Sequence, residues 1–153
     1  MEFETINDIV EFAIEREIEA AEFYQTAAEN EDVKGTAEVL IEYAEEERKH
    51  EKMLKNLKNN QNKIAEYKFK KIQDIKRSDY LIDLKYQKGL TYVEIMRLAM
   101  KREEKALALY QKLAQASENP EQVNVFTILA QEEAKHKNYF ETLYDDYMES
   151  QGD

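Results

Sequence analysis

The sequence contains no cysteine, and only three glycines and one proline occur among its 153 residues. Without cysteine there can be no disulfide, no thiolate metal site and no cysteine nucleophile. Glycine and proline form turns and interrupt helices, so their scarcity disfavours a turn-rich β protein. No hydrophobic run approaches the roughly 20 residues that span a bilayer. The sequence therefore predicts an all-α protein with a single domain at residues 1–153.

Acidic residues outnumber basic ones by 33 to 22, which gives a formal net charge of −11. Nucleic acids and anionic membranes bind cationic surfaces, so neither is expected as a partner. The N-terminal segment carries Glu2, Glu4, Asp8 and Glu11 and does not resemble a signal peptide. We therefore expect a cytoplasmic protein.

Four segments carry hydrophobic residues at alternating steps of three and four, the pattern of a helix that buries one face. The predicted helices are at roughly residues 6–29, 33–57, 92–117 and 120–148. A crossover at residues 58–90 joins the second helix to the third. Thr91 and Glu94 have the spacing of a capping box, and Asn119-Pro120 is a typical helix start. Two helical hairpins joined by one long crossover are typical of a ferritin-like four-helix bundle.

The sequence repeats itself at an offset of 86 residues. Sixteen of the 53 positions from 5 to 57 are identical to their counterparts, whereas composition alone would give about four. The only two histidines, His50 and His136, are such a pair, and each ends the phrase Ala-x-Glu-Glu-x-x-His. We expect the same helical hairpin to be used twice.

Six ionisable residues in the middle of the hydrophobic stripes are repeated in this way: Glu17, Glu47, His50, Glu103, Glu133 and His136. In each Glu-x-x-His phrase the two side chains project from one face of a helix, because they are three residues apart. At 1.5 Å per residue, all six are expected at one level of the bundle. Four carboxylates and two imidazoles should therefore converge in the interior.

Four buried carboxylates need opposing charge, since an isolated buried carboxylate would take up a proton instead. Two divalent metal ions would balance them. One glutamate from each of two helices, with Glu-x-x-His from each of the other two, is the pattern of dinuclear carboxylate proteins. Iron or manganese suits such ligands, and zinc would also bind but could not change its oxidation state. The alternative is that each Glu-x-x-His phrase is a solvated pair on the helix surface.

The phrase Ala13-Ile14-x-x-Glu17-x-x-Ala20-x-x-Phe23-Tyr24, its counterpart from Ala99 to Tyr110 and the two Glu-x-x-His phrases resemble the rubrerythrin branch of the ferritin-like superfamily. The resemblance implies a centre of two iron ions that reacts with hydrogen peroxide or oxygen. It implies that Glu17, Glu47, Glu103 and Glu133 are carboxylate ligands, with Glu47 and Glu133 as bridges, and that His50 and His136 are terminal ligands. Full-length rubrerythrins also carry an iron–cysteine domain. Because this chain has no cysteine, its electrons must come from another protein such as a rubredoxin.

The sequence differs from rubrerythrins in one further respect. Rubrerythrin peroxidases carry an extra carboxylate on the third helix, one turn from its ligand glutamate. The corresponding positions here are Met100 and Ala106, and the symmetric set of six ligands is closer to that of bacterioferritin.

The predicted function is that of a di-iron oxidoreductase that reduces hydrogen peroxide with electrons from an external donor. Ferroxidase or iron-handling activity is the first alternative, and a helical interaction module with a structural metal site is the second. Only 17 residues follow His136, too few for the fifth helix that lines ferritin cages. We therefore expect a homodimer rather than a cage.

Other residues near the predicted ligands have two interpretations. Tyr24 and Tyr110 lie two helical turns beyond Glu17 and Glu103, so their hydroxyls could hydrogen-bond to a ligand carboxylate or to a backbone group. The remaining four are expected in solvated or surface positions: Glu46, Glu132, Arg16 and Arg102.

Overall fold

The computed structural model describes residues 6–31, 34–59 and 89–151. Its helices within these ranges are α1 (Ile6–Glu29), α2 (Lys34–Asn59), α4 (Tyr92–Ala116) and α5 (Pro120–Gln151). Every helix end lies within three residues of its predicted position, and the described residues include no strand. The all-α prediction is confirmed. Most of the predicted crossover at residues 58–90 lies outside the described residues.

Two helices begin at the caps that the sequence predicts. The hydroxyl of Thr91 accepts a hydrogen bond from the backbone N–H of Glu94 at 3.2 Å and donates one to Glu94 Oε1 at 3.0 Å. Asn119 Oδ1 accepts from the backbone N–H groups of Glu121 and Gln122, at 2.8 and 3.2 Å. The first backbone N–H groups of a helix have no carbonyl partner within the helix, and these side chains accept their hydrogen bonds instead.

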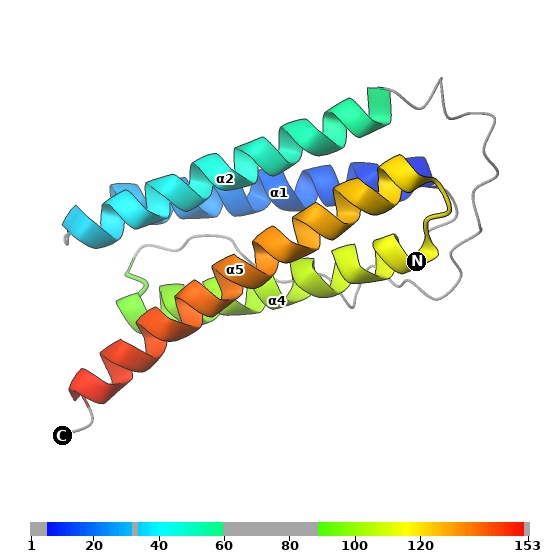
Figure 1. The fold of residues 1–153 in the computed structure, drawn as a ribbon. Coiled ribbons are helices and arrows are strands. Elements are labelled where there is room, and N and C mark those ends of the chain that lie inside the picture. The colour runs from blue at the N-terminus through cyan, green and yellow to red at the C-terminus, as the bar shows by residue number, and fades with distance from the viewer. Residues whose placement is uncertain (1–5, 32–33, 60–88, 152–153) are drawn as a thin grey trace.

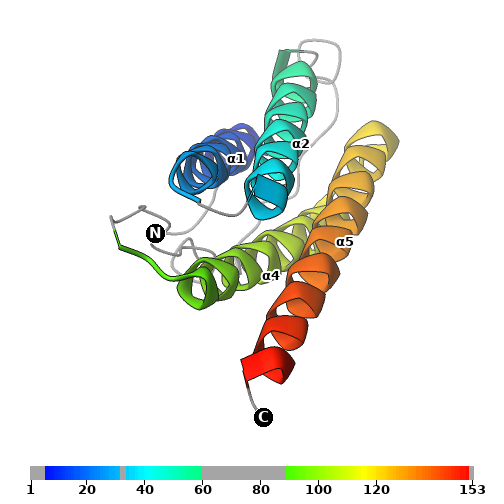
Figure 2. The ribbon, with the colours of Figure 1, turned by 90° about the vertical axis from the view of Figure 1, so that its left-hand side faces the viewer.

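The helices form two antiparallel hairpins, α1 with α2 and α4 with α5, and the hairpins lie against each other (Figures 1 and 2). This is the pairing of the two helical hairpins that the sequence predicts. The longest helix, α5, has 32 residues and extends past the other helices toward the C-terminus (Figure 1). Each helix therefore directs one stripe of side chains into the space between the hairpins.

The buried hydrophobic side chains of the described helices form two clusters. One cluster, near the start of α1, includes Val10, Leu57 and Phe126. The other, near the end of α1, includes Ala28 and Phe140. The ionisable residues of the stripes lie between these clusters in sequence and along the helices, so both ends of the site are sealed by hydrophobic packing.

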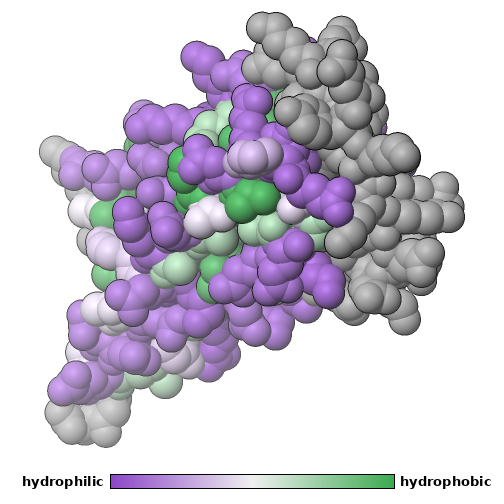
Figure 3. Space-filling model, turned by 45° about the vertical axis from the view of Figure 1, so that its right-hand side comes forward, coloured by the Kyte–Doolittle hydropathy of each residue, from purple (hydrophilic) through white to green (hydrophobic). Residues whose placement is uncertain are grey.

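The described surface contrasts with this interior. Hydrophilic side chains cover most of the described part of the face seen in Figure 3, with hydrophobic residues in small patches between them. None of the described helices combines the length and the hydrophobicity that a membrane span requires.

Candidate metal centre

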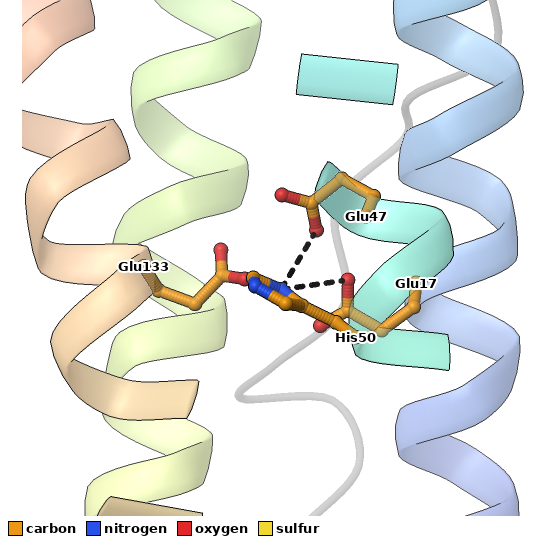
Figure 4. Close-up of side chains that lie close together, drawn as sticks. All are labelled: Glu17, Glu47, His50 and Glu133. Carbon is orange, nitrogen blue, oxygen red and sulfur yellow. Dashed lines mark ion pairs between the residues drawn. The ribbon is translucent and has the colours of Figure 1, made fainter. Parts of the chain in front are cut away.

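The six predicted residues lie together in the interior, with contributions from each of the four described helices. The side chains of the four glutamates are completely buried, and the histidines are 2 and 4 % exposed. Helices α1 and α4 each provide one glutamate, and α2 and α5 each provide a Glu-x-x-His pair. Figure 4 shows four of these side chains, Glu17, Glu47, His50 and Glu133, pointing toward one another. The predicted convergence is thus what the structure contains, although their role as metal ligands stays a prediction.

The cluster divides into two overlapping groups of four. The first group is Glu17, Glu47, His50 and Glu133, and the second is Glu47, Glu103, Glu133 and His136. Within each group, one ligand-type atom from every residue lies within 4.8 Å of the others. Glu47 and Glu133 belong to both groups, which is the position that a bridging carboxylate requires. Each group also has one glutamate and one histidine of its own.

Each histidine faces carboxylates of the opposite hairpin as well as its own. His50 Nδ1 lies 2.7 Å from Glu133 Oε1 and 3.7 Å from Glu17 Oε2. His136 Nδ1 lies 3.0 Å from Glu47 Oε1. The two imidazole rings stack with their centroids 5.7 Å apart and their planes 9° apart. The site is therefore built across the interface between the hairpins.

Two buried tyrosines hold the glutamates that are not shared. Tyr24 donates its hydroxyl hydrogen to Glu103 Oε1 at 2.6 Å, and Tyr110 donates to Glu17 Oε1 at 2.5 Å. Of the two interpretations from the sequence, the structure therefore shows the hydrogen bond to a carboxylate, and in each case the carboxylate belongs to the other hairpin. Burial and the adjacent carboxylates raise the pKa of both phenols well above the ordinary value. Both hydroxyls therefore remain donors at neutral pH.

The prediction that Arg102 lies on the surface is wrong. Its side chain is only 3 % exposed, and its guanidinium lies among the four glutamates. The physical reason is charge, because four carboxylates converge in a space from which water is excluded. Its repeat counterpart Arg16 does lie near the surface, with 21 % of its side chain exposed.

The charges of the cluster are balanced from within. Burial raises the pKa of Glu47 to about 7 and that of Glu133 to about 8, since the opposing effect of Arg102 offsets the loss of water only in part. Burial also acts to raise the pKa of Glu17, but Arg102, Glu47 and His50 together outweigh it and hold that pKa below the ordinary value. Burial alone would lower the pKa of His136. The carboxylates of Glu103 and Glu47 together raise it by more, so that the pKa is about 10.

Several atoms of the cluster are suited to bind metal because they are buried without an aligned hydrogen-bond partner among the described residues. These atoms are Glu17 Oε2, Glu47 Oε2, Glu133 Oε1 and both ring nitrogens of His50. Buried polar atoms normally have partners. Oxygen and imidazole nitrogen together are also the donors that iron and manganese accept. The residues present therefore fit a centre of two metal ions.

Glu46 and Glu132 lie beside the cluster and are partly buried. Glu46 forms an ion pair with Lys49 at 3.2 Å, and Glu132 forms one with Lys135 at 3.3 Å. These i,i+3 pairs agree with the solvated positions predicted for both residues. Their carboxylates also approach His136 to within 4.8 Å, a proximity that the sequence analysis did not predict.

The fold and the buried cluster define the class of the protein as a ferritin-like helical bundle whose Glu and His side chains suggest a site for two metal ions. A family model described as Rubrerythrin matches residues 8–144. The chain belongs to the rubrerythrin family.

Two solved structures are similar to this chain over more than nine tenths of its length. A hypothetical protein from Pyrococcus furiosus is 26% identical, with a TM-score of 0.71, and the match covers 92% of this chain and 89% of that one. A protein from Thermotoga maritima, provisionally described as a ferritin-like diiron-carboxylate protein, is 22% identical with a TM-score of 0.74. That match covers 96% of this chain and 99% of the other, and it supports the fold alone. Among curated proteins, none matches the sequence significantly.

Proposed function

We propose that the protein is a di-iron oxidoreductase that reduces hydrogen peroxide with electrons from an external donor protein. The observation that carries this proposal is the pair of buried ligand groups that share Glu47 and Glu133. Reduction of one peroxide to two water molecules consumes two electrons and two protons, and two bound ferrous ions would supply the two electrons. Zinc at the same site could not, because it does not change its oxidation state.

The side chains around the site have separate tasks in this proposal. Glu17 and Glu103 would each bind one metal, held in place by the hydroxyls of Tyr110 and Tyr24. The hydrophobic clusters at both ends of the site limit access of water. The chain has no cysteine and so no iron–cysteine centre, which supports an external donor such as a rubredoxin.

Ferroxidase or iron-handling activity is the second candidate, and one observation favours it. The positions one helical turn from Glu103 hold Met100, which is partly buried, and Ala106, which is 7% exposed. Neither can supply the extra carboxylate that the resemblance to rubrerythrin peroxidases implies. The ligand set is therefore symmetric between the two metal positions.

Rapid mixing of the Fe(II)-loaded protein with peroxide or with oxygen distinguishes the two candidates. Under anaerobic loading and at matched oxidant concentrations, we expect peroxide to oxidise the iron faster than oxygen does. Glu133→Ala should abolish the fast reaction with both oxidants, whereas Glu45→Ala, which changes an exposed carboxylate on α2, should leave it intact. Faster oxidation by oxygen would replace the peroxidase proposal with the ferroxidase one. A folded protein that binds no iron would contradict both.

A further inference from the structure

The guanidinium of Arg102 contacts both of the overlapping ligand groups. Its Nη2 atom lies 3.0 Å from Glu17 Oε2 and 3.0 Å from Glu47 Oε2. Its Nη1 atom lies 2.5 Å from Glu133 Oε2 and 3.4 Å from Glu103 Oε2. One nitrogen thus serves carboxylates of the first group and the other serves carboxylates of the second. The planar, forked guanidinium thus directs one of its terminal nitrogens to carboxylates of each ligand group.

The repeat shows the same residue in a second position. Arg16 stands 86 residues before Arg102, yet its guanidinium points away from the carboxylates. It lies 3.6 Å from Glu19 and 3.9 Å from Glu15, and its Cζ is 4.9 Å from the centre of the Phe12 ring. An arginine at this position of the hairpin can therefore lie either inside the site or along the outer side of its helix.

The charges along each helix explain which position is adopted. On α1, Glu15 and Glu19 offer Arg16 two carboxylates on the outer side. At the same offset, α4 carries Lys101 and Lys105. An outward guanidinium on α4 would thus find lysines in place of both carboxylates, and the like charge of Lys105, three residues along the helix, disfavours it. Inside, it meets four carboxylates.

We infer that Arg102 is a displaceable internal counter-ion, which occupies the carboxylate cluster in the absence of metal and leaves it for an outward position when metal binds. The inference rests on the proposed metal centre. A carboxylate oxygen that binds a metal lies about 2.0–2.2 Å from it. Two of the oxygens suited to bind metal, Glu17 Oε2 and Glu47 Oε2, are among those that contact the guanidinium. Metal and guanidinium cannot both occupy this space.

Charge balance leads to the same conclusion. Two divalent ions already match four carboxylates, so an arginine that stayed inside would leave one positive charge in excess in a buried site. The guanidinium cannot relieve this excess by losing a proton, because arginine is not deprotonated in proteins. It must therefore move.

This role makes Arg102 a determinant of metal affinity, because every metal that binds must first expel it. A titration calorimetry experiment with Mn(II) on chelator-treated protein tests this directly. Manganese is chosen because it binds most weakly among the first-row divalent ions, which keeps dissociation constants measurable. We expect Arg102→Met to bind Mn(II) more tightly than the unmodified protein, by about tenfold or more, which corresponds to at least about 1.4 kcal/mol.

A second variant leaves all residues of the cluster in place. It tests the inference even where Arg102→Met does not fold without metal. Lys101→Glu with Lys105→Glu reproduces on α4 the charges that surround Arg16 and offers Arg102 an outward partner. We expect tighter Mn(II) binding here as well. The same two substitutions in the Arg102→Met background control for the long-range effect of added negative charge, and there the gain should be clearly smaller.

The outcomes separate this inference from the proposed function. Unchanged or weaker Mn(II) binding in Arg102→Met and in the lysine variant would overturn the counter-ion role and leave the metal centre standing. An equal gain from the lysine substitutions with and without Arg102 would also overturn it. Failure of the unmodified protein and of every variant to bind Mn(II) would overturn both the inference and the metal centre.

Discussion

Two of the four glutamates are shared between the ligand groups and two are not. Replacing a shared glutamate by alanine should therefore reduce metal binding more than replacing one that is not shared. Glu47 belongs to both groups, whereas Glu17 belongs to only one. Glu47→Ala should therefore remove a ligand from both metals, and Glu17→Ala should remove a ligand from one. Metal analysis after anaerobic loading with Fe(II) is expected to give about two ions in the unmodified protein, about one in Glu17→Ala and close to none in Glu47→Ala. The repeat provides a second comparison, since Glu103→Ala and Glu133→Ala should behave in the same two ways.

Thermal stability gives an independent measure of the same difference. A ligand that binds only the folded state, present at 100 times its dissociation constant, stabilises that state by about 2.7 kcal/mol. Two such metal ions contribute about 5 kcal/mol, which in a chain of 153 residues raises the Tm by about 10–20 °C. Glu17→Ala should keep about half of this metal-induced shift, and Glu47→Ala should keep almost none.

The control is Glu45→Ala on the same helix, because Glu45 is exposed and lies outside both groups. It should retain the full metal content and the full shift. The metal-induced shift is compared rather than the absolute Tm, because each substitution also changes the stability of the protein without metal. Equal losses of metal in Glu17→Ala and Glu47→Ala would show that the two glutamates are equivalent and would refute the shared-ligand geometry.

Three further substitutions test the supporting contacts. Tyr110→Phe removes the hydrogen bond to the buried Glu17 and should lower the free energy of unfolding by about 1–3 kcal/mol, measured by urea denaturation; no loss would mean that the bond is not formed in solution. Thr91→Ala removes the N-cap of α4 and should cost about 1 kcal/mol in the same assay, with Thr91→Ser as the control that retains it. Met100→Glu adds a carboxylate one turn from the site and should widen the preference for peroxide over oxygen; an unchanged ratio of oxidation rates would contradict that.

The fold was predictable because each helix carries its own signals in the sequence. Hydrophobic periodicity locates the buried stripes, and the caps at Thr91 and Asn119 set two helix starts to the residue. The site was predictable for a different reason. The repeat places ionisable residues at matching heights on four helices, and an interior stripe fixes the direction of every side chain that belongs to it.

The buried position of Arg102 was not predicted, because Arg102 does not belong to the hydrophobic stripe of its helix. It precedes Glu103 by one residue and so leaves the helix about 100° away from it. Periodicity assigns such a residue to the flank of the helix, but a long side chain at the flank can reach either inward or outward. The signal that distinguishes the two is the exchange of Glu15 and Glu19 for Lys101 and Lys105 between the repeats. Charge, rather than hydrophobicity, decides the position of this side chain.

The polar contacts of the site also connect the two hairpins. Tyr24 binds Glu103, and Tyr110 binds Glu17, each across the interface between the hairpins. The two histidines likewise lie close to carboxylates of the opposite hairpin. Metal ligation by residues from all four helices would add further links across the same interface. Metal affinity and the association of the hairpins would therefore be coupled, since any substitution that weakens one of these crossing contacts would remove support from both.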